Sequence, residues 1–282
     1  KDEESRIRAV YNYVASSIRP VFLDFPSAGF SVSDAGEVLR RRYGASQDQA
    51  ALLVAMLRAL KIEAYPAFLG TMDTGRIQKS FASPDQLSHA LVAVARKKEW
   101  LFLDPSMRDC AFGDLPPAVQ GRDALVVKEK GGTLAFIPMA PPEKNQESVQ
   151  IEAGLSPEGT LNQVMIVEET GANSILLRGL LRGMKPEEKA LIFQKLVNQI
   201  AEDGRLVKYD YTSPDDLSES FRIYLAFTAE NYPGVARGHF VLKLPIFVST
   251  KLAEMVQDSP QERRYPLLLG NTNLEEKHIH IV

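Results

Sequence analysis

The stretch from Ser46 to Leu60 constrains the fold of this chain more than any other. Alanine, leucine, valine and methionine occupy nearly every side of the helix that it would form, and a helix that is apolar all round has to be buried. Serine favours the N-cap position, so we expect Ser46 to cap this helix. The chain must therefore place a central helix, beginning at Ser46, inside a core that other elements surround.

The chain is long enough for two domains and has the composition of a soluble globular protein. It has 282 residues, of which 45% are hydrophobic and 24% are charged. Its net charge of −3 leaves no basic excess with which to bind nucleic acid. No apolar run reaches about 18 residues, the length that a membrane-crossing helix needs. We therefore expect neither a nucleic-acid partner nor a membrane span.

Cysteine and histidine are too sparse to predict a metal site. Cys110 is the only cysteine, which excludes an internal disulfide and any site built from several thiolates. His278 and His280 alternate on one face of a terminal strand, yet two histidines make a weak site without a third ligand. No phosphate-binding glycine loop or dinucleotide fingerprint is present. We expect no metal and no cofactor; calcium dependence stays open, since the sequence has no EF-hand loop pattern.

Local patterns predict short elements around the central helix. They are a helix over residues 2–19, a capped short helix over 34–42, a strand over 63–70 and a loop over 71–87. The short helix opens with Asp34 followed by Glu37, which resembles a capping box. Within the predicted strand, Pro66 favours an edge position or an irregular strand, because proline cannot donate to the ladder.

Two short apolar stretches, 89–95 and 100–104, are predicted to form a β-hairpin. The turn can pivot on either side of Lys97. One register places His89 directly opposite Asp104, and the other makes the two residues diagonal. In either register their β-carbons lie roughly 5 to 8 Å apart on one face. The hairpin therefore predicts contact between an imidazole and a carboxylate.

The second half of the chain follows a proline-rich polar stretch at residues 138–147. It is predicted to hold a hairpin over 150–168, a helix over 186–200, strands over 221–227 and 239–244, and a strand-like end over 278–282. The predicted class is α+β throughout. The expected domains are a core of helices packed on a small antiparallel sheet over 1–137, a linker over 138–149 and a strand-rich α+β domain, cut short, over 150–282.

One set of residues in the first third of the chain has a distinctive order and spacing: Arg41, Gly44, Ser46, Asp48, Ala50, Leu57-Arg58-Ala59-Leu60, Ile62, His89 and Asp104-Pro105. With this set, residues 5–105 resemble the transglutaminase-like core of bacterial proteins, which has a papain-like cysteine peptidase fold. The usual string of that family is Arg-x-x-Gly-Asp-Cys-Lys-Asp-x-Ala before a helix that ends near Leu-Arg-Ala-Leu-Gly-Ile. A histidine that opens a strand and an Asp-Pro that closes the next strand complete it.

A weaker likeness covers about residues 150–282, through Leu155 to Thr160 and Leu177 to Leu181. It resembles the trailing part of bacterial proteins that carry such a core behind a domain of unknown function. Those proteins are exported, so the resemblance implies a periplasmic or otherwise exported protein. It also implies that this chain is a piece of a longer protein with further domains.

Four positions depart from the family pattern. Ala45, Ser46, Gln47 and Lys61 stand where the family has aspartate, cysteine, lysine and glycine. In the family chemistry a cysteine thiolate attacks an amide, the histidine carries the proton and the aspartate orients the imidazole ring. Serine is far harder to deprotonate than cysteine. Several neighbouring differences favour natural divergence over an engineered Cys→Ser change, although that alternative stays open.

The resemblance implies Ser46, His89 and Asp104 as the residues of the catalytic site. Our first hypothesis is a pseudoenzyme that binds peptide or protein in the former substrate cleft, near Ser46, His89 and Trp100. The alternative is a serine-dependent amidase or peptidase in which Ser46 is the nucleophile, His89 the base and Asp104 the residue that orients it. The two hypotheses differ in whether the Ser46 hydroxyl reacts.

The same residues also have plain structural interpretations. Ser46 as a helix cap would contribute about 1 kcal/mol to stability, and His89 with Asp104 would be a buried polar pair. Asp48, on the first turn, is predicted to be a solvated or a dipole-favoured carboxylate rather than a catalyst. Trp100 is expected in the core first and in a cleft second. Cys110 is predicted to be a small buried thiol rather than a replacement nucleophile.

Overall fold

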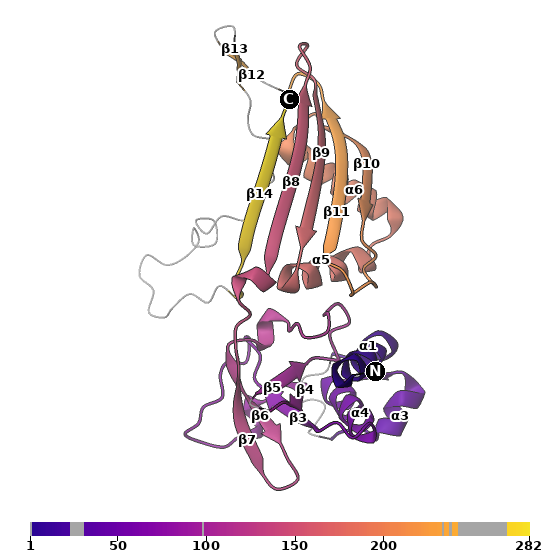
Figure 1. Cartoon of the computed structure of the whole chain (residues 1–282), viewed down its shortest axis with the longest axis vertical. Helices are drawn as coiled ribbons and strands as arrows, with labels where there is room; N and C mark the ends of the chain where they lie inside the picture. Colours follow the sequence, from indigo (N-terminus) through magenta and orange to yellow (C-terminus); the bar gives the residue numbers. More distant parts are fainter. Residues whose placement is uncertain (1, 23–30, 98, 233, 237–238, 242–269) are drawn as a thin grey trace.

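The computed structural model describes residues 2–22, 31–97, 99–232, 234–236, 239–241 and 270–282. Two five-stranded sheets dominate these residues, and each has helices beside it. The first sheet belongs to the N-terminal half of the chain and the second to the C-terminal half, and Figure 1 shows one below the other. The predicted α+β class is confirmed.

The first sheet is antiparallel, with the strand order β5-β4-β3-β6-β7. Its strands are β3 (Ala64–Leu69), β4 (His89–Ala95), β5 (Trp100–Leu103), β6 (Arg122–Val127) and β7 (Gly132–Ile137). The other elements of this half are α1 (Glu3–Ser17), α3 (Ala35–Arg41), α4 (Ser46–Ala59) and the paired short strands β1 (Arg19–Pro20) and β2 (Tyr43–Gly44). The elements predicted from the sequence before residue 104 are all present.

Helix α4 is the central helix that the sequence predicts. It packs against α1, α3, β3 and β4, and Leu53 and Leu57 are fully buried together with Tyr11 of α1 and Val92 of β4. Burial on every side holds only for the first part of α4, because Ala55, Arg58 and Ala59 are exposed. The N-terminal half of α4 is therefore enclosed, and its first residue is held in a fixed position.

Strand β4 separates two apolar cores. Ala90 and Val92 pack toward α4 and α1, whereas Leu91 and Ala93 pack on the opposite face with Phe102 of β5. Both faces of the strand are buried, which explains its nearly continuous apolar sequence. The position of the residue that opens β4 is thus fixed by packing on both sides of the sheet.

The hairpin of β4 and β5 adopts the later of the two predicted registers. Val92 lies opposite Leu103, and Ala95 lies opposite Trp100. His89 and Asp104 are therefore diagonal rather than directly opposite. Because β5 ends at Leu103, Asp104 follows the paired stretch directly.

Pro66 lies in the third strand of the sheet, so the prediction of an edge strand was wrong. β3 pairs with β4 along its length, and Pro66 lies opposite Val92. On its other side, β3 pairs with β6 only at Ala67 and Phe68. Proline has no N–H to donate, and this one lies outside the part of β3 that is paired on both sides. The short ladder to β6 is what allows a proline in an interior strand.

The second sheet has the strand order β10-β11-β9-β8-β14, and β14 runs parallel to β8. Its strands are β8 (Gln146–Leu155), β9 (Leu161–Glu169), β10 (Arg205–Tyr211), β11 (Phe221–Ala229) and β14 (Leu274–Ile281). Helices α5 (Gly171–Gly183) and α6 (Pro186–Ile200) pack on it, with α5 at the end nearer the first sheet (Figure 1). The strands β12 (Gly234–Ala236) and β13 (His239–Val241) form a separate pair.

Several predictions for this half are confirmed. The hairpin over 150–168 is formed by β8 and β9, and α6 has the predicted bounds. β8 begins at Gln146, inside the predicted linker. Of the strand predicted over 239–244, residues 242–244 lie outside the described residues. The domain boundaries stay predictions. In the described part of the chain, no helix is long and apolar enough to cross a membrane.

Ion pairs join the two halves where the segment after β5 meets α5. Arg108 pairs with Asp215 at 2.9 Å, and Arg182 of α5 pairs with Asp109 and, at 3.2 Å, with Asp215. All four side chains are at least partly exposed. Exposed pairs contribute little individually to stability, but together they fix the course of the segment that follows Asp104.

Tyr11 is a buried tether between α1 and the same segment. Its hydroxyl donates to the carbonyl oxygen of Cys110 at 2.9 Å and approaches that of Asp104 at 3.3 Å. We expect Tyr11→Phe to lower the free energy of unfolding by about 1–2 kcal/mol, because buried carbonyl oxygens lose their donor. Urea denaturation measures this, with Tyr13→Phe on the same helix as the control. Equal stabilities of the two variants would contradict the expectation.

Candidate functional site

The start of α4 is organised by Asp48 rather than by Ser46. The Asp48 carboxylate accepts hydrogen bonds from the backbone N–H of Ala45 at 3.2 Å and of Ser33 at 2.8 Å, and pairs with Arg41 at 2.8 Å. Ala45 is therefore the N-cap residue, and the prediction that Ser46 caps the helix was wrong. Asp48 is only 7% exposed, so the predicted solvated carboxylate is instead a buried one with three partners.

The Ser46 side chain is free for another contact because Asp48 organises the helix start. Its Oγ accepts a hydrogen bond from the backbone N–H of Ala90, at 3.3 Å. β5 pairs with β4 only from Val92 to Ala95, so the N–H of Ala90 lies beyond the end of that ladder. The serine hydroxyl thus supplies an acceptor for β4 one residue after His89.

His89 and Asp104 form a direct pair. The Asp104 carboxylate accepts from His89 Nε2 at 2.8 Å through Oδ2. Its Oδ1 accepts from the backbone N–H of Ser106 at 3.1 Å and from the Ser106 hydroxyl at 2.6 Å. Asp104 is fully buried, whereas the imidazole is 18% exposed. The carboxylate is held on both oxygens, and Nδ1 of the ring remains for another partner.

The electrostatics of this pair favour the imidazolium form. Burial lowers the pKa of His89, but the charge of Asp104 and the hydrogen bond to it outweigh burial, so the pKa lies above its usual value. A carboxylate that orients and charges a histidine is the arrangement found in acid–base sites. The same arrangement also occurs in structural pairs, so the pair alone does not define a reaction.

The three predicted site residues are brought together, but not by a complete chain of side-chain bonds. Ser46 Oγ bonds to the residue next to His89, and His89 bonds to Asp104. Among the described residues, no hydrogen bond joins the Ser46 hydroxyl to the imidazole. A nucleophile and its base need an approach of roughly 2.6–3.2 Å, although this distance is often longer before substrate binds.

Trp100 does not lie beside these residues, so the predicted cleft shared by Ser46, His89 and Trp100 was wrong. Trp100 pairs with Ala95, at the opposite end of β4 from His89. β4 has 7 residues, which at about 3.3 Å each span roughly 20 Å. The indole ring instead meets the Tyr65 ring edge to face, at a centroid distance of 6.1 Å.

Two site residues were not predicted from the sequence. Ser106 lies two residues after Asp104, a spacing at which a serine commonly bonds a nearby polar group, and this was the available signal. Gln47 is 4% exposed, and its Oε1 has no partner among the described residues. The sequence marks Gln47 only as the residue that stands where the family has lysine, and it does not predict that this amide is buried.

The remaining chemical candidates do not contribute to this site. Cys110 is a free, buried cysteine, and burial raises the pKa of its thiol well above the usual value. His278 is exposed and bonds to Glu276 at 3.0 Å. Across the described ranges, no cluster of three or more histidine, cysteine, aspartate or glutamate side chains has a geometry suited to a metal ion.

We expect Asp48→Ala to lower the free energy of unfolding by about 2–3 kcal/mol. The substitution removes a partly buried ion pair and leaves two backbone N–H groups without their acceptor. Asp34→Ala is the matched control, because Asp34 caps α3 through two backbone N–H groups but is exposed. Asp34→Ala should lower the free energy of unfolding by about 1 kcal/mol. Urea denaturation of both variants measures the difference, and equal losses would contradict the role of burial.

Part of this chain is similar to a known protein family. The model of the transglutaminase-like superfamily matches residues 1–105. A crystal structure of a "putative protease" from Parabacteroides distasonis is similar over 82% of this chain, at 13% identity and a TM-score of 0.42. The similarity spans 46% of that protein, so this chain corresponds to less than half of its length. No curated protein matches. The first 105 residues of this chain form a transglutaminase-like core.

Proposed function

We propose that this core is a non-catalytic module that binds a peptide or protein segment, and that Ser46 does not act as a nucleophile. The observation that supports the proposal is the hydrogen bond of the Ser46 hydroxyl. Its oxygen accepts from the backbone N–H of Ala90, and among the described residues no hydrogen bond joins the hydroxyl to the imidazole of His89. The serine therefore completes the hydrogen bonding of β4 rather than donating to a base.

The chemistry of the nucleophile position points the same way. A cysteine thiolate forms readily beside a histidine and a helix N-terminus, because its pKa starts at about 8.5. A serine hydroxyl has to lose its proton to a base during attack. A raised histidine pKa favours the imidazolium that a cysteine thiolate needs beside it. Here Ser46 takes the place of that cysteine, so there is no thiolate.

A serine amidase or peptidase is the second candidate, and one observation favours it. The orienting half of a catalytic triad is intact, since Asp104 holds His89 and is itself held by Ser106. Only the bond between Ser46 and His89 is missing, and such bonds are often long before substrate binds. This candidate requires the Ser46 hydroxyl to donate its proton to the imidazole.

A fluorophosphonate probe separates the two candidates. Incubated with the full chain, it should leave Ser46 unmodified, because no base activates the hydroxyl. Intact-mass measurement and peptide mapping read the result, with a trypsin sample as the positive control. Modification of Ser46 that disappears in His89→Ala would overturn the binding-module proposal and establish the serine enzyme.

Binding itself is tested with a phage-displayed random peptide library selected on the full chain. Selected peptides should bind Ser46→Ala as well as the unchanged protein, because the hydroxyl is not used in chemistry. They should lose affinity for Ser46→Trp, which fills the position beside His89. Ser218→Trp, at an exposed serine of the C-terminal half, is the matched control. Peptides that bind all of these variants equally would place the interaction elsewhere and contradict the proposal.

A further inference from the structure

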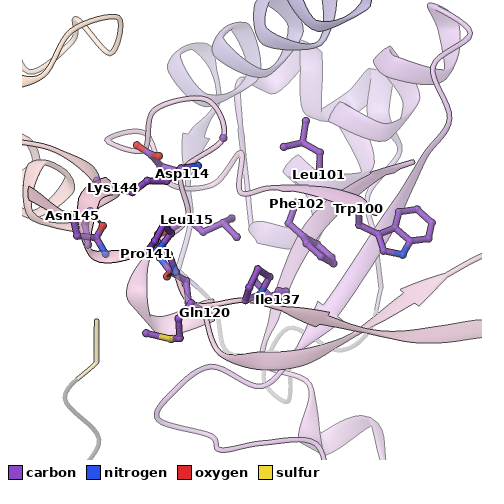
Figure 2. Close-up of a pocket in the computed structure, with 16 residues that line it drawn as sticks. Trp100, Leu101, Phe102, Asp114, Leu115, Gln120, Ile137, Pro141, Lys144 and Asn145 are labelled. Carbon is purple, nitrogen blue, oxygen red and sulfur yellow. Dashed lines mark hydrogen bonds between the residues drawn. The ribbon is translucent and has the colours of Figure 1, made fainter. Parts of the chain in front are cut away.

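A cavity of about 240 Å³ lies where the first sheet meets the start of α5. Figure 2 shows its centre lined by the apolar side chains of Phe102, Leu115 and Ile137. Trp100 lies at one end, and Asp114 and Lys144 lie at the other. The cavity contains none of the three triad residues. Cavities at the junction of two structural units, apolar with a few polar groups, are common ligand sites.

The side-chain amides that line this cavity are already engaged. Gln120 donates to the carbonyl of Leu115 at 2.6 Å and accepts from the N–H of Ala140 at 2.7 Å. Asn145 donates to Thr272 at 3.0 Å and accepts from the N–H of Ala172 at 3.0 Å. These amides hold the walls together. They are not available to a ligand without breaking the contacts that shape the cavity.

Asp114 differs from the two amide side chains because its carboxylate is not engaged within the described part of the chain. It is half-buried, and its carboxylate has no hydrogen bond or ion pair to any residue that the structure describes. Lys144 lines the same cavity, yet among the described residues no ion pair joins it to Asp114. Burial raises the pKa of Asp114, and the charge of Lys144 partly offsets this. An unpaired carboxylate next to an apolar wall is costly unless a partner neutralises it.

We propose that this cavity binds a small organic cation, a primary ammonium group on an aliphatic or aromatic stem. The ammonium pairs with Asp114, and the stem lies along Leu115, Phe102 and Ile137. The volume is below that of pockets for drug-sized ligands, so a ligand of the size of phenethylamine suits it. We infer a cation rather than an anion because the Asp114 carboxylate accepts hydrogen bonds and repels anions. This site is independent of the function proposed for Ser46.

Isothermal titration calorimetry of the full chain at pH 7.5 tests the proposal with two matched ligands. Phenethylamine carries the ammonium, and 2-phenylethanol has the same stem without the charge. Phenethylamine should bind at least about tenfold more tightly, the effect of a partly desolvated charge pair. Asp114→Asn should weaken phenethylamine to the level of the alcohol and leave the alcohol unaffected. Glu143→Gln, the same charge change at a neighbouring residue that does not line the cavity, should change neither.

A measurement on the unchanged protein keeps the test independent of how Asp114→Asn folds. Phenethylamine affinity should fall as the pH is lowered and Asp114 gains a proton, whereas 2-phenylethanol affinity should stay constant. The Tyr11 hydroxyl and the Cys110 thiol, whose pKa values burial raises, remain neutral over that range. Equal affinities of the two ligands, no binding of phenethylamine, or unchanged binding to Asp114→Asn would each overturn the proposal.

Discussion

Ser46→Cys is expected to create a thiol that iodoacetamide alkylates at neutral pH. The sulfur would lie at the first residue of α4, where the helix dipole stabilises an anion, and near the His89 imidazole, whose pKa is raised. Both effects lower a thiol pKa from about 8.5, by one unit or more at comparable sites. The ultraviolet absorbance of the thiolate, followed against pH, gives the pKa directly. Alkylation rates measured over the same pH range should follow it.

Two controls make this result specific. Cys110 is buried with a raised pKa, so the unchanged protein should not be alkylated under the same conditions. Ser46→Cys combined with His89→Ala should titrate at least about one unit higher than Ser46→Cys alone, because the imidazolium is gone. An ordinary pKa in the single variant, with no response to His89→Ala, would mean that the imidazole does not reach the nucleophile position. It would weigh against both candidate functions.

Glu169→Gln is expected to make the protein more stable at alkaline pH. Glu169 on β9 lies directly opposite Glu147 on β8, and Glu275 on β14 lies on the other side of Glu147. The cation in this row, Lys277, is 3.2 Å from Glu275 and 3.8 Å from Glu147. Glu169 is 5% exposed and carries an Oε2 without a hydrogen bond among the described residues. A neutral side chain is therefore better tolerated here than a carboxylate.

The sign of the effect follows from the pKa. Burial first, then the charge of Glu147 and the hydrogen bond to it, raise the pKa of Glu169 from 4.5 to about 8. The folded state then holds a proton that the unfolded state releases above pH 4.5, so stability falls as the pH rises toward 8. At about 1.4 kcal/mol per pH unit, a pKa of about 8 against 4.5 corresponds to a loss on the order of 5 kcal/mol. The proton belongs to the carboxyl pair rather than to one residue.

Urea denaturation between pH 5 and pH 8.5 tests this expectation. The unchanged protein should lose stability over that range, and Glu169→Gln should flatten the curve. Glu152→Gln is the matched control, because Glu152 lies on β8, the strand of Glu147, but is exposed. A Glu169→Gln curve parallel to that of the unchanged protein would show that the pair titrates normally.

The sequence predicted the elements before residue 104 well because they have strong local patterns, whereas β6 and β7 were not predicted. The apolar run after Ser46, the cap at Asp34 and the alternation around His89 all correspond to observed elements. The two registers of the hairpin could not be separated from the sequence, because both place His89 and Asp104 on one face. The observed register is fixed by packing of β4 against two cores, which is a long-range effect.

The failures also have identifiable causes. Ser46 suits the N-cap position, yet Asp48 bonds to the N–H of Ala45 and moves the cap by one residue. Pro66 suits an edge strand, yet the short ladder to β6 leaves room for it in the interior. The prediction that Trp100 lies near the site failed because Trp100 lies at the opposite end of β4 from His89. Local sequence preference determines whether a segment forms a helix or a strand. Tertiary contacts determine its exact cap residue, its register and its place in the sheet.

The segment that follows Asp104 is bonded to both halves of the chain. Asp104 and the carbonyl of Cys110 are held within the first half, by Ser106 and Tyr11, while Arg108 and Asp109 are paired with residues of the second half. Separation of the two halves would therefore displace the short backbone segment that holds the Asp104 carboxylate against the His89 imidazole. Mechanical or ligand-driven separation of the two sheets should therefore change the pKa of His89, because that pKa depends on the contact with Asp104.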